Sequence, residues 1–199
     1  LTAPGVASTD EPYNIVVGGI GGGGVLTIGG LLGMAAHLEG KTATVLNESG
    51  LAQKNGAVQS HIRVVSDDSA QLSARVAERS ADLVIGADIV VVCGTGPRAT
   101  MDRTRTHAIV NEDVRPTVAF ARNGNMNLST RPMVRLLQRA TDDKAVFLDA
   151  ERLATALMGD AIYTNLFLLG YALQAGLLPV GVQALERAIE LNGVAIASN

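Results

Sequence analysis

The sequence predicts an α/β fold with a largely parallel sheet, helices on both faces and a helical carboxyl-terminal third. Two patterns support this prediction. Short β-branched runs alternate along the chain with longer segments of helical periodicity, which is typical of a parallel sheet covered by helices. After Asp149 the apolar residues recur only at helical spacing. The 199 residues suffice for one domain with a buried core.

The expected elements follow in chain order. Strands are expected at 15–17, 42–46, 57–65, 83–85, 107–110, 117–120 and 145–148. The first helix is expected from Val25 to about Glu39, with Gly40 ending it. Residues 89–93 are ambiguous, because their length suits a strand and their position after Asp88 allows a helix start. Apolar stripes mark two later helices, one at Ile162, Leu166, Leu169 and Leu173 and one at Val182, Leu185 and Ile189.

The domain organisation is expected to be simple. Residues 1–12 are small, polar and proline-containing, and we expect them to be a linker or arm. Residues 13–199 are expected to form one α/β domain. The chain starts without Met and stops without a tail, so we expect a fragment of a larger fused enzyme.

One uncharged run, from Ile15 to Ala36, has the length and hydropathy of a membrane span. Nine of the 22 glycines lie between Gly18 and Gly33, however. Each glycine costs about 1 kcal/mol in a helix interior. The run is therefore predicted to be a strand, a glycine turn and a helix, and no membrane association is expected.

Composition excludes several function classes. The net charge is −3 and there are only six aromatic residues, so no nucleic-acid partner is expected. The single cysteine, Cys93, cannot form an internal disulfide or hold an iron–sulfur cluster alone, and no metal site is predicted. No signal peptide is visible, which favours a reducing, cytoplasmic setting. Charged residues make up only 18%, which indicates a surface partly covered by something else.

The segment 19–24 is the first candidate site, because it reads Gly-Ile-Gly-Gly-Gly-Gly between a strand and a helix. This is the context of a Rossmann-like turn, where glycines let a ligand approach the backbone and the helix amino terminus attracts phosphate. The candidate cofactor-binding residues here are Gly19, Gly21, Gly22 and Gly24. Glu48 stands where a ribose-binding acid is expected. Glycines that only permit a tight strand–helix turn explain the pattern slightly better than a bound dinucleotide.

A second candidate site is the polar stretch that begins at Gly50. Gln53, Lys54 and Asn55 are clustered donors and are the catalytic candidates, with Gly56 beside them as a cofactor-binding candidate. Such a loop can hold a carboxylate or a phosphate, with Lys54 as the mobile charge. An ordinary solvated loop is the competing interpretation. The neighbouring Ser60 and His61 alternate along a strand, so they are not predicted to form a catalytic dyad.

Other polar residues have structural interpretations. Asp160 is expected to cap a helix and Asn165 to be an inward-facing polar group, with an interface role as its alternative. Arg103 and Arg105 are expected on a solvated surface, and Cys93 to be a small buried residue.

Several longer segments resemble the gamma component of 2-oxoacid:ferredoxin oxidoreductases. The similarity covers roughly residues 13–199. It is carried by 13–22 (YNIVVGGIGG) and 35–40 (AAHLEG). The stretch 50–63 (GLAQKNGAVQSHIR) is similar to the indolepyruvate branch, as are Gly159-Asp160, Asn165, 169–172 (LGYA) and 185–193 (LERAIELNG).

This resemblance implies a reaction and a set of partners. An arylpyruvate such as indolepyruvate would be oxidatively decarboxylated on coenzyme A, with electrons leaving through [4Fe–4S] clusters to ferredoxin. Thiamine diphosphate with Mg would carry the carbanion chemistry. These groups would be held by thiamine-binding and ferredoxin-like domains or subunits, in an oligomer. The glycine turn and the 53–56 loop would face the active-site or coenzyme A side.

The chain also departs from the family pattern. Gly23 stands where many members have Gln, and Glu48-Ser49 replaces an expected Asp-Met-Thr type stretch. The sequence contains no thiamine motif and no cysteine cluster, so the isolated chain is expected to be inactive. Two alternatives stay open: a free-standing Rossmann nucleotide-binding module, and a purely structural assembly domain.

Overall fold

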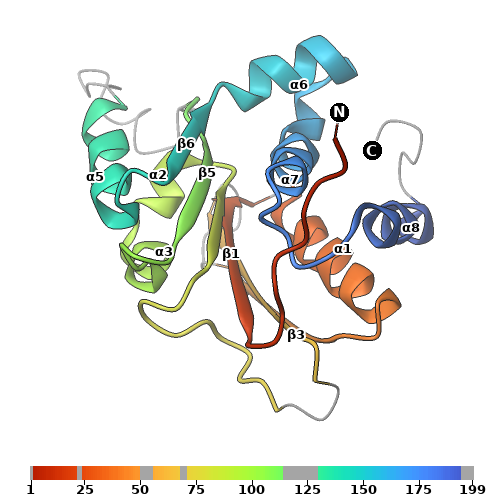
Figure 1. Ribbon diagram of the computed structural model, residues 1–199. Helices are drawn as coiled ribbons and strands as arrows, with labels where there is room; N and C mark the ends of the chain where they lie inside the picture. Colours follow the sequence, from red (N-terminus) through yellow and green to blue (C-terminus); the bar gives the residue numbers. More distant parts are fainter. Residues whose placement is uncertain (1, 22–23, 50–55, 68–70, 114–129, 194–199) are drawn as a thin grey trace.

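The computed structural model describes residues 2–21, 24–49, 56–67, 71–113 and 130–193. Six strands form one sheet (Figure 1): β1 (Tyr13–Ile20), β2 (Thr42–Ser49), β3 (Ala57–Val65), β4 (Leu83–Gly86), β5 (His107–Asn111) and β6 (Ala145–Leu148). The helices are α1 (Val25–Leu38), α2 (Ile89–Val92), α3 (Thr95–Thr100), α5 (Arg131–Thr141), α6 (Ala150–Met158), α7 (Thr164–Gln174) and α8 (Val182–Asn192), with a 3-10 turn η1 (Ala161–Tyr163).

The strand order is β2-β3-β1-β4-β5-β6. The pairs β1–β4, β4–β5 and β5–β6 are parallel, whereas β3 runs antiparallel to both β1 and β2. The α/β class is thus confirmed, with a mixed sheet in which β3 alone is reversed. The connection 50–56 explains the reversal, because seven residues are too few for the crossover that a parallel neighbour needs.

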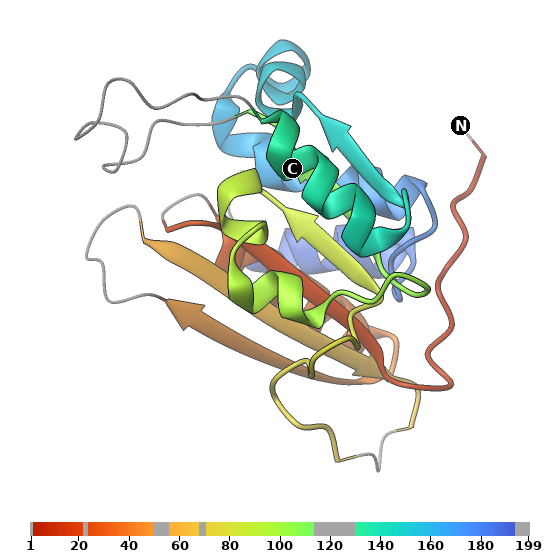
Figure 2. The same cartoon turned by 90° about the vertical axis from the view of Figure 1, so that its left-hand side faces the viewer.

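Helices cover both faces of the sheet, as predicted (Figures 1 and 2). One core lies under α1, α7 and α8, and includes the fully buried Ile15, Leu32, Ile62 and Leu169. The other lies under α2, α3 and α5, and includes Val16, Val84 and Leu137. Adjacent residues of β1 enter different cores because successive side chains of a strand point to opposite faces. The predicted helical third follows β6 as α6, η1, α7 and α8.

The ambiguous segment forms the helix α2 over residues 89–92, with Cys93 as its C-cap, because the Asp88 side chain accepts a hydrogen bond from Val91 N at 2.9 Å and caps the start. Ile162 does not belong to the apolar stripe of α7. It lies in η1 with 72% of its surface exposed, because the change of helix type breaks the spacing. The strand expected at 117–120 falls outside the described residues.

The segment that precedes β1 is hydrogen-bonded to the rest of the domain. Ala7 N donates to Leu178 O at 2.9 Å, and Ser66 N donates to Thr9 O at 2.8 Å. The run 15–36 forms β1 and α1, so the strand–turn–helix prediction is confirmed over its described part. None of the helices that the structure describes has the length and hydropathy needed to cross a bilayer.

Candidate functional site

The carboxyl-terminal edge of the parallel strands carries a cavity of about 310 Å³. Ile20 from β1, Ala87 after β4 and Asn111 from β5 lie at its floor, and the segment Asp160–Asn165 contributes one wall. Open α/β sheets bind ligands at this edge, in the crevice beyond the strand ends. The cavity therefore marks the candidate site by its position in the fold.

Two buried side chains shape this cavity. Asn111 is 3% exposed; its Nδ2 donates to Ala87 O at 3.4 Å, and its Oδ1 accepts from Ala150 N at 3.0 Å. Asn111 thus joins the end of β5 to the loop after β4 and to the start of α6. Asp88, also 3% exposed, caps α2 beside it. The sequence analysis did not single out Asn111, because its two partners lie 24 and 39 residues away.

The described lining of the cavity is acidic. It includes the carboxyl groups of Asp88, Asp113, Glu151 and Asp160 and no basic side chain. Carboxylates repel phosphates, so the described part of this lining offers no charge that favours a diphosphate.

Asp160 and Asn165 take the positions expected of them. The Asp160 side chain accepts from Ile162 N at 2.8 Å and caps η1, as predicted. Asn165 is 6% exposed at the start of α7 and reaches the start of α1, where a Cβ added at Gly24 would lie 3.5 Å from Asn165 Nδ2. The carboxyl-terminal helices therefore close over the glycine turn.

The glycines of the turn serve different purposes. A Cβ at Gly19 would lie 2.7 Å from Val25 Cγ2 and 2.9 Å from the Ala87 side chain, so packing alone requires glycine at this position. Gly24 precedes α1 with φ of 82°, in the left-handed region that favours glycine. Gly21 N donates to Gly56 O at 2.9 Å. Gly22 lies outside the described residues.

The hydrogen bond from Gly21 N to Gly56 O brings the glycine turn and the end of the 50–56 loop together. Gly56 precedes β3 and contacts Gly21 at the end of β1, and Ser49 ends β2 at the same edge of the sheet. The Gly56 end of the 50–55 loop therefore adjoins the glycine turn, while its other end follows β2 at the same edge, with β3 between β2 and β1. Gln53, Lys54 and Asn55 themselves lie outside the described residues.

Glu48 does not occupy the ribose-binding position, and that expectation was wrong. In this sheet β3 lies between β2 and β1, so Glu48 sits on the outermost strand. Its Oε2 accepts from Arg75 at 2.7 Å and lies 3.5 Å from His61 Nε2. The hydrogen bond from Arg75 holds the pKa of the Glu48 carboxyl below its usual value.

His61 and Ser60 point to opposite faces, which confirms that they form no dyad. Ser60 Oγ donates to Asn47 Oδ1 at 2.8 Å under α1. His61 is 2% exposed on the other face, and its Nδ1 accepts from Val76 N at 3.4 Å. Burial lowers the pKa of His61, so the neutral ring is favoured. Cys93 is half-buried, and burial raises the pKa of its thiol to about 11.

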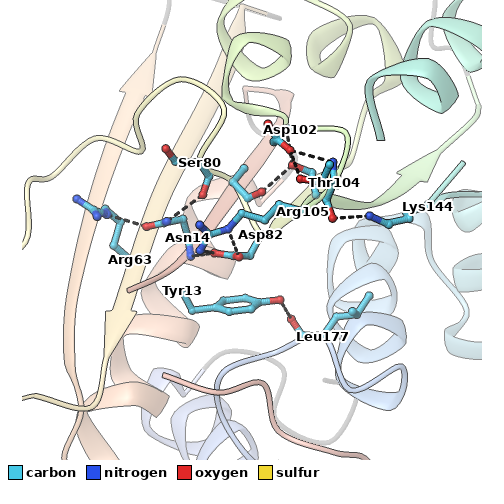
Figure 3. Close-up of polar contacts among 12 residues, drawn as sticks. Tyr13, Asn14, Arg63, Ser80, Asp82, Asp102, Thr104, Arg105, Lys144 and Leu177 are labelled. Carbon is cyan, nitrogen blue, oxygen red and sulfur yellow. Dashed lines mark hydrogen bonds and ion pairs between the residues drawn. The ribbon is translucent and has the colours of Figure 1, made fainter. Parts of the chain in front are cut away.

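A second polar cluster lies at the opposite, amino-terminal edge of the sheet (Figure 3). Asn14 Oδ1 accepts from Arg63 Nε at 2.7 Å, and Asn14 Nδ2 donates to Ser80 O at 2.9 Å. Asp82 accepts from Asn14 N at 2.8 Å and forms a two-pronged ion pair with Arg105. Arg105 is therefore engaged in the fold rather than merely solvated. These contacts bind strand ends together, so the cluster is structural.

The described residues offer no set of three His, Cys, Asp or Glu side chains arranged to hold a metal ion. A thiamine diphosphate–Mg pair needs cationic or donor side chains for its phosphates, and no basic side chain stands in the described lining of the cavity. A [4Fe–4S] cluster needs four thiolates, and the chain has one cysteine. These groups therefore do not fit the described part of this chain.

Known proteins share this sequence and fold. An indolepyruvate oxidoreductase subunit IorB from Pyrococcus horikoshii is 29% identical over 186 residues, covering 92% of this chain and 87% of the relative. The crystal structure of the pyruvate oxidoreductase subunit PORC from Thermotoga maritima matches with a TM-score of 0.63 at 16% identity, covering 94% and 90% of the two chains. The gamma subunit of a keto/oxoacid ferredoxin oxidoreductase from Geobacter sulfurreducens matches with a TM-score of 0.60 at 17% identity, covering 93% and 88%.

The two solved structures support the fold that the sequence predicted. The model of the family described as pyruvate ferredoxin/flavodoxin oxidoreductase matches residues 14–197, nearly the whole chain. The resemblance noted in the sequence is thereby confirmed, and this chain belongs to the pyruvate ferredoxin/flavodoxin oxidoreductase family.

Proposed function

We propose that the chain is the gamma-type component of a 2-oxoacid:ferredoxin oxidoreductase whose substrate is an arylpyruvate such as indolepyruvate. The observation that carries this proposal is the similarity to the IorB subunit, which runs along 92% of this chain rather than through one motif. The reaction is an oxidative decarboxylation that forms an acyl-coenzyme A and reduces ferredoxin.

The proposal divides the chemistry between this chain and its partners. Thiamine diphosphate with Mg supplies the carbanion stabilisation, and [4Fe–4S] clusters carry the electrons. Thiamine-binding and ferredoxin-like domains or subunits hold these groups, because the described residues do not fit them. The assembly works in the cytoplasm, with ferredoxin as the acceptor. The isolated chain is inactive.

The carboxyl-terminal edge of the sheet is the side that we assign to the active site. Asn111 and Asp88 act as positioning residues there, because their hydrogen bonds hold the strand ends and the starts of α2 and α6 in one arrangement.

Lys54 is the residue that we propose meets an anionic group. It belongs to the loop that joins β2 to Gly56, and Gly56 is hydrogen-bonded to Gly21 of the glycine turn at this same edge. A flexible lysine ammonium suits a carboxylate or a phosphate. Replacing it removes a charge-assisted hydrogen bond without altering the described fold.

Reconstitution tests the assignment. The thiamine-binding partner polypeptide is purified with and without this chain, and the reduction of a viologen dye is followed with indolepyruvate, pyruvate and 2-oxoglutarate. We expect activity only when both are present, with the highest kcat/KM for indolepyruvate. A partner that is fully active alone would remove the catalytic role. A preference for pyruvate or 2-oxoglutarate would correct the substrate.

The visible spectrum gives an independent readout. The native assembly should show a broad brown absorbance that bleaches on addition of indolepyruvate, as its clusters accept electrons. A colourless assembly that does not respond would contradict the whole assignment.

Lys54→Gln tests the anion contact within the active assembly. We expect kcat/KM to fall about 10- to 100-fold, the effect of losing one hydrogen bond to a charged group. Lys144→Gln is the control, because the Lys144 ammonium donates to Thr104 O at the opposite edge of the sheet. Equal effects of the two substitutions, measured as kcat/KM, would refute the contact.

A further inference from the structure

The outer side of α1 differs from a normal helix surface. Leu26, Met34 and Leu38 are 50%, 42% and 43% exposed. With Gly30 they follow one another at one-turn spacing, so they form a continuous stripe. The helix contains no Lys, Arg, Asp or Glu, and His37 is its only ionisable residue.

Two other surface helices of the same chain, α5 and α8, follow the usual rule. The exposed side of α5 carries Arg131, Arg135 and Arg139, and α8 exposes Glu186 and Arg187. A surface helix normally presents charged residues to water, and an uncharged one is normally covered. The apolar stripe on α1 is therefore expected to pack against another protein surface, because the described part of this chain leaves it exposed.

The apolar stripe continues onto β2. A Cβ added at Gly33 would lie 3.0 Å from Val45 Cγ2, so α1 rests directly over β2, and Val45 is itself 38% exposed. β2 is the outermost strand, and no other strand or helix lies along its outer side among the described residues (Figure 2). We call the stripe, Gly33, Val45 and this open edge the α1–β2 surface.

The open edge lacks the usual protection against pairing. β2 has eight residues, no proline and no lysine, and its single carboxylate, Glu48, is held by Arg75. The opposite edge strand, β6, is by contrast four residues long and lies between Lys144 and Asp149. Natural sheets keep exposed edges short or charged, so an unprotected edge indicates a strand that is paired in the assembly.

We propose that the α1–β2 surface is the interface between two copies of this chain. The two β2 strands pair antiparallel across a two-fold axis near Val45, which joins two six-stranded sheets into one of twelve strands. A second copy of β2 can pair with the unpaired backbone N–H and C=O groups of this edge without a change in the conformation of either strand.

The same strand pairing would also bring the apolar stripes of the two α1 helices together. α1 lies over Val45 of β2 and Ser60 of β3, since an added Cβ at Gly29 would contact both. Strands are about 4.8 Å apart, so the two α1 axes would lie about 10 Å apart on the same face of the joined sheet. That is the distance of packed helices. Gly30, which has open space where a Cβ would stand, lets them approach.

Charge does not oppose a second copy at this surface. Each copy carries a net charge of −3, but the exposed stripe of α1 contains no Lys, Arg, Asp or Glu. A strongly charged partner would find no complementary charges on it. This inference does not depend on the proposed function.

The test is sedimentation equilibrium of the 199-residue chain at 1–100 µM. The diagnostic variant is Gly30→Glu. A Cβ at Gly30 meets no atom within 4 Å, so the fold accepts the side chain, while the two copies would bring two carboxylates together. Gly170→Glu is the matched control, because Gly170 is also exposed on a helix with no atom within 4 Å of an added Cβ.

We expect the wild-type chain and Gly170→Glu to sediment as dimers. For Gly30→Glu, the dissociation constant should rise at least about 100-fold. Circular dichroism checks that both variants are folded. The thermal midpoint should rise with concentration for the wild type and Gly170→Glu but not for Gly30→Glu.

Three results would overturn the proposal. One is a monomeric wild-type chain at 100 µM. Another is a dimer that both substitutions leave intact or weaken equally. The third is a chain that is monomeric alone but binds the thiamine-binding polypeptide in a Gly30-dependent way, which would assign the surface to that partner.

Discussion

Asn14 connects three separate parts of the chain at the amino-terminal edge of the sheet (Figure 3). It is 4% exposed, and its side chain binds Arg63 of β3 and the carbonyl of Ser80 ahead of β4. Asn14→Ala removes both hydrogen bonds and should lower the free energy of unfolding by about 2–3 kcal/mol, measured by urea denaturation.

The control for Asn14 is Arg79→Ala. Arg79 also forms an ion pair, with Asp102 at 2.9 Å, but its side chain is 78% exposed. An exposed pair contributes less than about 1 kcal/mol. If the two substitutions lowered the free energy of unfolding equally, burial would not explain the contribution of Asn14 to stability.

His61 makes stability depend on pH near neutrality. Burial lowers its pKa in the folded state, so below the ordinary value of about 6.5 the unfolded chain binds the proton more readily. The contribution of the neutral His61 to the free energy of unfolding is fully present above about pH 6.5. It falls as the pH drops below this value, by at most about 1.4 kcal/mol per pH unit. Glu48 and Arg75, which face His61, keep their charges over this range.

Unfolding free energies at pH 7.5, 6.5 and 5.5 test this expectation. His61→Gln should flatten the profile. A profile that His61→Gln does not alter would assign the pH dependence to another group.

At the scale of elements, replacing glycine by alanine should lower stability around the start of α1 and raise it in α7. Gly24→Ala places a Cβ on a residue with φ of 82° and should cost about 1–2 kcal/mol. Gly19→Ala should cost about 1–3 kcal/mol, because its Cβ would lie 2.7 Å from Val25. Gly170→Ala, in an open helix position, should gain up to about 1 kcal/mol. Thermal unfolding ranks the three variants, and a stabilised Gly24→Ala would contradict the assigned backbone conformation.

Elements are the level at which the sequence was most informative. The β-branched run of β1 and the helical spacing of α1 reflect contacts between near neighbours, so their pattern appears in the sequence itself. Strand order depends on contacts between distant segments, and the insertion of β3 between β2 and β1 was not predicted. The short 50–56 connection was the available signal, since it excludes a parallel neighbour.

The candidate site was predictable only in part, for the same reason. The glycine turn and the Gly56 loop were found because each is a local motif, and their contact at Gly21 follows from the edge they share. Asn111 and Asp88 were not recognised as shaping a cavity. Single polar residues at strand ends carry no pattern until the fold brings their partners together.

At the scale of the whole molecule, the helical third and the sheet should unfold as one unit. Leu169 of α7 and Leu137 of α5 are fully buried on opposite faces of the sheet. Because α1, α7 and α8 share one core with β1, neither part can lose its packing alone. Leu169→Ala and Leu137→Ala should each cost about 2–5 kcal/mol, and Leu157→Ala, 72% exposed, should change little. Calorimetry should show a single transition in every variant, and an early separate transition in Leu169→Ala would instead make the carboxyl-terminal helices an independent unit.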